Sequence, residues 1–244
     1  MTDHNAVDDQ APCPDAPADD LFPHGEPFDP CGKSAGRPRT ADMEARLHNL
    51  LGHATRLFLE KGYSNVSLET IAREAHVAVR TIYVKFGGKA GLLNAAVASV
   101  RERYFSTMAD MDTDPRPIDQ ILSDFGQRHI ELVSMPSAVR MHRMVVSEAS
   151  TNPALVDSFY AAGPGQSREA LSRFFSRPEV RPLFRAELSA EVLTSHLLNC
   201  IMGDHGKRLL FDPPNPPTEA ELHAKVTLGL GLFFRGCLRA PDLR

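Results

Sequence analysis

The sequence predicts an all-α protein, and three observations carry this prediction. Apolar residues recur at three- and four-residue spacing from about residue 41 to residue 238. No segment alternates apolar and polar residues before a hairpin turn, as antiparallel strands do. Glycine- and proline-rich breaks divide the periodic pattern into segments of helical length. With 42% hydrophobic and 24% charged residues, the 244-residue chain is globular in composition, which excludes collagen, a coiled-coil rod and a wholly disordered chain.

The charge of the chain is unevenly distributed. A formal net charge of −4 argues against nucleic-acid binding only if the charge is spread evenly. Residues 1–32 carry −8, residues 33–105 carry +6 and residues 106–244 carry −2. This distribution indicates an acidic tail, a basic module and a near-neutral body, each with its own role.

The first 40 residues are expected to lie outside the folded core. Residues 1–32 contain six prolines and no apolar periodicity, which predicts a disordered acidic tail. Residues 33–40 form a basic arm. The Gly-Lys-Ser sequence in this region is not a phosphate loop, because Pro27 stands where that loop needs glycine and no strand precedes it.

The first helix is expected over about residues 41–61. Thr40 is a suitable N-cap, Asp42 and Glu44 favour the helix start, and Gly62 favours its end. Ser67 then caps a short helix, a turn follows at His76, and further helices are expected over about residues 78–85 and 89–104. The body is expected to contain helices over about residues 117–135, 139–150, 153–176, 189–211 and 218–238.

Residues 66–86, VSLETIAREAHVAVRTIYVKF, have the character of a helix-turn-helix motif. Ile82 and Phe86 are expected to hold the second helix to the core, with Val77 in the turn. The outer surface of that helix would then present basic, hydroxylated and β-branched side chains, which suit a DNA major groove. These outer residues are Val79, Arg80, Thr81, Tyr83, Val84 and Lys85.

From Phe58 to Leu93 the chain reads FLEKGYSNVSLETIAREAHVAVRTIYVKFGGKAGLL, which resembles the TetR/AcrR family of bacterial transcriptional regulators. The similarity covers about residues 46–93. The chain departs from the family pattern at four positions: His76, Ala78, Lys85 and Gly88. His76 replaces the turn glycine, which predicts either a strained turn or a left-handed conformation at that residue. The base preference of the family therefore does not transfer to this chain.

The resemblance implies a helix-turn-helix DNA-binding domain over residues 41–88 and a set of DNA-contacting residues. Backbone phosphates would be held by Ser67, Tyr83, Lys85 and Lys89. Base edges would be met by Val79, Arg80 and Thr81, with Arg80 suited to guanine. Arg37 and Arg39 would enter the minor groove. Three alternatives stay open: Tyr83 as a core residue, Lys85 as a solvated charge, and the arm as a plain linker.

Residues 89–244 would form a helical ligand-binding and dimerisation domain, as the resemblance implies. The last two long helices would pair with their copies in a two-fold dimer. The expected interface residues are Leu193, Leu197, Leu198, Ile201, Leu228, Leu232 and Phe233. The candidate pocket residues are His129, Met141, His142, Met144 and Phe159, although a methionine-rich helix is more often core.

His196, Cys200, Asp204 and His205 are candidate metal ligands, because the first three share one helix face. The same segment is the expected dimer interface, so we expect no metal and no cofactor.

No catalytic motif is present in the sequence, and an enzyme is not expected. The four cysteines form no CxxC pair. The first residues do not have the basic-then-apolar pattern of a secretory signal peptide. No apolar stretch approaches the roughly 20 residues that a membrane span needs. We expect a cytoplasmic protein without a membrane partner.

The sequence thus predicts a homodimeric regulator, expected to be a repressor, that binds a palindromic double-stranded DNA operator. An unidentified small-molecule effector would release it. The alternative is a DNA-binding adaptor regulated by a protein partner, with no small-molecule ligand.

Overall fold

The computed structural model describes residues 40–211 and 216–239. The predicted tail at residues 1–32 and the arm with Arg37 and Arg39 lie outside these residues. The described part contains α-helices, one 3-10 turn and no strand, which confirms the predicted fold class. The helices are α1 (Thr40–Lys61), α2 (Leu68–Glu74), α3 (Val79–Phe86), α4 (Lys89–Phe105), α5 (Ile118–Ser134), α6 (Pro136–Glu148), α7 (Pro153–Ala162), α8 (Pro164–Ser176), α9 (Ala190–Met202), α10 (His205–Leu210) and α11 (Glu219–Cys237), with η1 (Arg181–Leu183) between α8 and α9.

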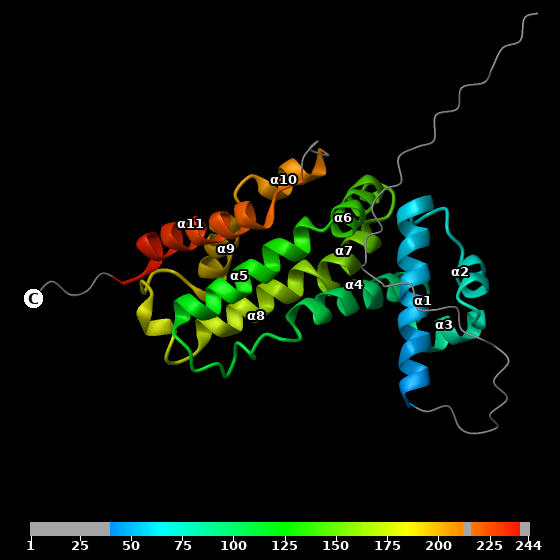
Figure 1. Ribbon diagram of the computed structural model, residues 1–244, viewed down its shortest axis with the longest axis horizontal. Coiled ribbons are helices and arrows are strands. Elements are labelled where there is room, and N and C mark those ends of the chain that lie inside the picture. The colour runs from blue at the N-terminus through cyan, green and yellow to red at the C-terminus, as the bar shows by residue number, and fades with distance from the viewer. Residues whose placement is uncertain (1–39, 212–215, 240–244) are drawn as a thin grey trace, which may run out of the picture.

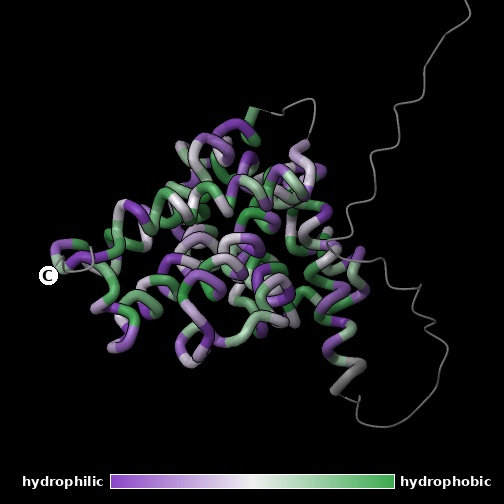
Figure 2. Tube along the Cα trace, turned by 60° about the vertical axis from the view of Figure 1, so that its left-hand side comes forward, coloured by the Kyte–Doolittle hydropathy of each residue, from purple (hydrophilic) through white to green (hydrophobic). Residues whose placement is uncertain are grey.

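The helices are arranged as a small N-terminal unit and a larger helical body. Figure 1 shows α2 and α3 on the side of α1 that faces away from the body, while α9 and α11 lie at the opposite end of the molecule. Polar and apolar residues are mixed along the helices, as expected of amphipathic helices that bury one face (Figure 2). None of the helices among the described residues combines the length and the apolar character that a membrane span requires.

Two helices predicted as continuous are each divided in the structure. The predicted helix over residues 153–176 breaks at Gly163, and Pro164 starts α8 at a position where a missing N–H costs nothing. The predicted helix over residues 189–211 breaks at Gly203, which has a φ of 51° and ends α9 before the short α10. The apolar periodicity continues across both breaks and misled the prediction, although Gly163-Pro164-Gly165 marks the first break in the sequence itself.

The N-terminal unit has its own hydrophobic core. Side chains from α1, α2 and α3 pack there with the first half of α4, which contributes the fully buried Leu92 and Leu93. Met141 of α6 and Leu155 of α7 complete the same core from the body. The core of this unit therefore depends on α4 and on the ends of two body helices.

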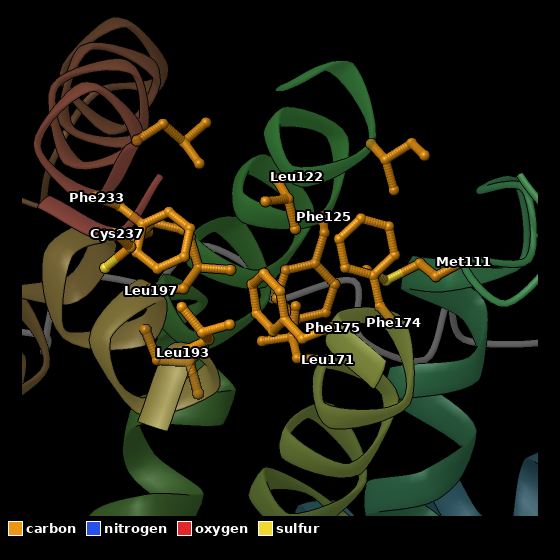
Figure 3. Close-up of a cluster of buried hydrophobic side chains, with 14 of the residues drawn as sticks. Met111, Leu122, Phe125, Leu171, Phe174, Phe175, Leu193, Leu197, Phe233 and Cys237 are labelled. Atoms are coloured by element: carbon orange, nitrogen blue, oxygen red, sulfur yellow. The ribbon is translucent and has the colours of Figure 1, made fainter. Parts of the chain in front are cut away.

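The body is built around a second core formed by α5, α8, α9 and α11 (Figure 3). Phe175 lies at its centre, with ring centroids 5.2 Å from Phe184 and 5.8 Å from Phe233. At the crossing of α9 and α11, Gly229 lies so close to Cys200 that a Cβ atom would clash with the carbonyl oxygen of that residue. This close approach fixes the separation of the two helices.

Candidate nucleic-acid interface

The segment that leads into α2 is shaped by Gly62 and Ser67. Gly62 has a φ of 82° and ends α1, as the sequence predicted. The Ser67 hydroxyl accepts a hydrogen bond of 3.2 Å from the Thr70 N–H and caps α2. Leu68 and Ile71 are buried, so α2 supports the following turn from the core side.

The turn between α2 and α3 contains a residue in a strained conformation. His76 has a φ of 53°, and among the described residues no other residue besides glycine has a positive φ. The N–H of Val77 donates to the carbonyl of Ala72 at 2.9 Å and closes the turn. Of the two predictions for His76, the left-handed conformation is confirmed, at a cost of order 1 kcal/mol relative to glycine.

Helix α3 has one face in the core and one in solvent. Ile82 is fully buried and Phe86 packs partly against the same core. Tyr83 is 56% exposed, and Arg80 and Lys85 are exposed as well. The structure therefore places an exposed arginine, tyrosine and lysine on one short helix that projects away from the body.

Two of the predicted base-reading residues are less accessible than Arg80. Val79 and Thr81 are half-buried, and Val79 packs partly against the N-terminal core. Val84 is 74% exposed and presents a larger apolar surface than Val79 does. The sequence placed Val84 on the outer surface without assigning it a contact.

Lys89 is engaged by the protein itself. Its ammonium donates to the carbonyl oxygens of Tyr63 at 2.7 Å and Val66 at 2.8 Å, and lies 4.4 Å from the centroid of the Tyr63 ring. Burial lowers the pKa of Lys89, and the negative charge of Glu148 opposes that change. Lys89 thus ties the start of α4 to the segment between α1 and α2. Two of the three ammonium N–H groups are used by these carbonyls, so only the third is left to donate to a DNA phosphate. The predicted contact of Lys89 with phosphate stays a prediction.

Glu148, at the end of α6, connects the body to the N-terminal unit. Its carboxylate accepts a 2.9 Å hydrogen bond from the Ser64 N–H and a second one from the Ser64 hydroxyl. Burial and the charge of Glu148 together raise the pKa of Tyr63. Sequence reasoning missed this contact, because no periodic signal links residues so far apart in the chain.

Comparisons with known proteins agree with this geometry. Residues 50–96 match the family model of bacterial regulatory proteins of the tetR family, and residues 120–236 match the C-terminal domain of AefR-like transcriptional repressors. The two matches together cover about two thirds of the chain. The chain belongs to the TetR family. It is accordingly a DNA-binding transcriptional regulator, in which α2 and α3 form the helix-turn-helix.

Individual proteins are also similar to this chain. It is 39% identical over 62 residues to the HTH-type transcriptional regulator HbdR of Aromatoleum sp. (strain CIB), and the match spans 25% of this chain and 27% of that protein. A TetR-family regulator from Mesorhizobium loti MAFF303099 has a similar fold, with a TM-score of 0.65, 20% identity, and coverage of 83% of this chain and all of that one. The flavonoid-responsive regulator FrrA aligns with a TM-score of 0.64 and 20% identity, over 81% of this chain and all of FrrA.

The residues expected at the dimer interface of this TetR-family regulator fall into two groups. Leu228 and Leu232 are 64% and 51% exposed on α11. The other side chains are buried within the protomer and cannot face a partner: Leu193, Leu197, Leu198, Ile201 and Phe233. This part of the prediction is corrected, because an apolar stripe on α9 and α11 packs against the protomer core and not against a second copy.

The five candidate pocket residues do not meet in one cavity. Met141 lies in the N-terminal core, with Met144 and Phe159 packed partly against it, and His142 stacks on Phe159 with ring centroids 6.0 Å apart. His129 instead stacks on Phe125 at 5.6 Å in the body. A groove of about 760 Å3 lies between α4 and the adjoining parts of α7 and α8, and none of the five lines it.

The residues weighed as metal ligands also have other surroundings. The Nε2 atom of His205 lies 2.7 Å from the hydroxyl of Ser134. Within the part of the chain that the structure describes, no three His, Cys, Asp or Glu side chains are grouped as a metal ion would need.

Proposed function

We propose that this chain acts as a homodimer that binds a palindromic operator through the two copies of α3 and represses transcription until a small molecule binds the helical body. The observation that carries the proposal is the exposed set of Arg80, Tyr83 and Lys85 on α3, within a module of charge +6. Positive charge binds phosphate, and an exposed arginine is suited to guanine. The match of the body to AefR-like repressors supports repression as the direction of control.

An exposed apolar row at the far end of the molecule supports the dimer. Leu228 and Leu232 are one helical turn apart on α11, and Val192 on the neighbouring α9 is 38% exposed. Large apolar side chains that remain exposed in a protomer often mark an interface. Helix α11, which carries Leu228 and Leu232, lies in the part of the body away from α3 (Figure 1), so a dimer formed through it leaves both copies of α3 accessible.

Helix α4 supports a route from ligand to DNA. Its first half belongs to the core of the N-terminal unit, and its second half lines the groove at Arg101 and Phe105. A molecule that enters the groove would displace α4 and, through Lys89, the segment before α2. We therefore propose that the DNA-binding domain of residues 41–88 moves together with the start of α4, relative to the remainder of residues 89–244.

The groove also favours a small-molecule effector over the adaptor alternative. Its volume of about 760 Å3 lies within the range of small-molecule sites. A regulator that binds DNA and responds to such a molecule would act in the bacterial cytoplasm, where the chromosome lies.

Paired substitutions on α11 test the dimer and its role in DNA binding together. In Leu228→Glu/Leu232→Glu, charge replaces the exposed apolar row, so the chain should sediment as a monomer and lose tight binding to the DNA upstream of its own gene. The control Lys207→Gln/Arg208→Gln changes the net charge by the same amount on the exposed surface of α10 and should remain dimeric. If the Leu228→Glu/Leu232→Glu variant kept the mass and DNA affinity of the unmodified chain, this dimer would be rejected.

A further inference from the structure

The groove beside α4 is of small-molecule size, and small apolar side chains, polar side chains and one cation line it. The polar ones are Asn94, Ser106 and Gln166, and the Ser106 hydroxyl and the Gln166 amide donate to backbone carbonyls. Ala95, Ala98, Ala161 and Ala162 line it, and Phe105 adds an aromatic ring. Small apolar side chains on both sides suit a ligand with a hydrocarbon or aromatic body.

Arg101 lines this groove without a partner for its charge. Its Nε atom is buried and has no hydrogen-bond partner, and Arg101 forms no ion pair with any described residue. The guanidinium lies over the Phe105 ring, with 5.2 Å between the Cζ atom and the ring centroid. A partly buried charge without an anion is unfavourable, so the structure leaves a need for negative charge at this position.

Two cations of α8, Arg168 and Arg173, act on this region, and Arg173 is itself paired with Asp112 and Glu169. Arg173 of α8 acts on Arg101, while Arg101 and Arg168 both act on His129 of α5. Arg168 donates only to the neutral Ser195 hydroxyl, at 3.2 Å. Glu102 also lines the groove, but it is exposed and is not among the charges acting on Arg101.

We propose that the groove binds an organic carboxylate, with its anionic end on the guanidinium of Arg101 and its apolar body along the alanines and Phe105. This inference rests on the proposed function and names the chemical class of its effector. The fork of N–H donors on a guanidinium matches the two oxygens of a carboxylate. Phosphate binds where several free donors converge, whereas the Ser106 hydroxyl and the Gln166 amide already donate to backbone carbonyls here. A single unpaired guanidinium beside small apolar side chains therefore suits a monoanion with an apolar body better than a phosphate.

Calorimetric titration of the full chain without DNA tests the proposal. The probes are octanoate and 3-phenylpropanoate, each paired with its neutral amide, octanamide or 3-phenylpropanamide. We expect at least one carboxylate to bind at least about tenfold more tightly than its amide. Arg101→Gln and Arg101→Met should each remove that preference. Arg208→Gln takes the same charge from an exposed residue of α10 and should leave it unchanged.

The melting temperature of the unliganded variants separates loss of binding from loss of folding. Because Arg101 lacks an anion in the free protein, Arg101→Met should melt at the same or a higher temperature than the unmodified chain. A clearly lower melting temperature would show that Arg101 supports the fold and would overturn the assignment.

Three binding results would also overturn the proposal: equal affinity for carboxylates and amides, unchanged affinity in both Arg101 variants, or no binding of either carboxylate at about 1 mM. Gel retardation of upstream DNA by the same samples separates this failure from a failure of the proposed function. A chain that binds DNA but no carboxylate refutes only the ligand class. If the chain binds carboxylate through Arg101 but retards no DNA, the proposed function is refuted and the carboxylate site at Arg101 stands.

Discussion

Arg80 and Ile82 lie close together in the sequence of α3 but on different faces of the helix, one exposed and one buried. Ile82 is fully buried and fixes the rotation of the helix, which turns Arg80 toward solvent. The left-handed turn at His76 then sets the direction in which α3 leaves α2. A short recognition helix is therefore positioned by buried residues and by the turn, while its exposed residues are free to contact DNA.

Arg80→Ala is expected to weaken binding to the preferred operator by about 1–3 kcal/mol and to relax selection at one base pair of each half-site. The reason is the loss of a two-pronged hydrogen bond to guanine. DNA selection and titration with both proteins measure the effect, and Arg208→Ala on the exposed surface of α10 is the control. An Arg80→Ala protein with unchanged base preference would contradict a base-reading role.

His129 provides a pH-dependent contribution to stability. Burial and the charges of Arg101 and Arg168 lower its pKa from 6.5 to about 4. Between pH 6.5 and about 4 the unfolded chain holds a proton at this position that the folded chain does not. The free energy of unfolding should therefore fall as pH decreases through this window, by up to about 1.4 kcal/mol per pH unit from this residue.

The histidine contribution is isolated by comparing substitutions. His129→Gln should reduce the fall in the free energy of unfolding between pH 6.5 and 4. Urea titrations at several pH values measure this, in buffers that contain no carboxylate that could bind the groove. His48, His142 and His205 have pKa values lowered by burial as well and act in the same direction, so some slope remains. His196→Gln, at an exposed position, should keep the original slope. Equal slopes in the His129→Gln and unmodified chains would refute the assignment.

At the scale of elements, the crossing of α9 and α11 determines how the body packs. Gly229 is buried there against the backbone of Cys200, and the free thiols of Cys200 and Cys237 lie in the same region. Burial raises the pKa of both thiols. Gly229 therefore serves the packing of α9 on α11 within one protomer.

Gly229→Ala is expected to destabilise the body by about 1–3 kcal/mol, because the added methyl group forces two packed helices apart. Gly236→Ala on the same helix is the matched control. It has open space around its Cα and should leave stability unchanged or raise it by up to about 1 kcal/mol through helix propensity. Chemical denaturation of both variants measures the difference, and a Gly229→Ala protein as stable as Gly236→Ala would contradict the close crossing.

At the scale of the whole molecule, local features were predictable and long-range ones were not. The caps at Ser67 and Gly62 and the burial of Ile82 follow from residue type and spacing, and the structure confirms them. The apolar residues of α9 were visible too, but an apolar stripe does not reveal whether it faces the protomer core or a partner. The contact between Glu148 and Ser64 and the unpaired charge of Arg101 depend on tertiary packing, for which the sequence carries no periodic signal.

Removing residues 1–32 is expected to leave DNA affinity unchanged or to increase it. These residues carry a charge of −8, and an acidic segment competes with phosphate for the basic module. The comparison requires titration of one DNA fragment at two salt concentrations, because any gain should shrink as salt rises. Weaker DNA binding after the deletion would show that the tail has a different role.

Selection of DNA by the full chain from a randomised pool at low salt, repeated with Arg80→Ala, tests directly whether α3 reads the operator. We expect the unmodified chain to enrich an inverted repeat, and the variant to lose selection at one position of each half-site. No enrichment by the unmodified chain, together with no retardation of its own upstream DNA, would contradict α3 as the recognition helix of a sequence-specific dimer.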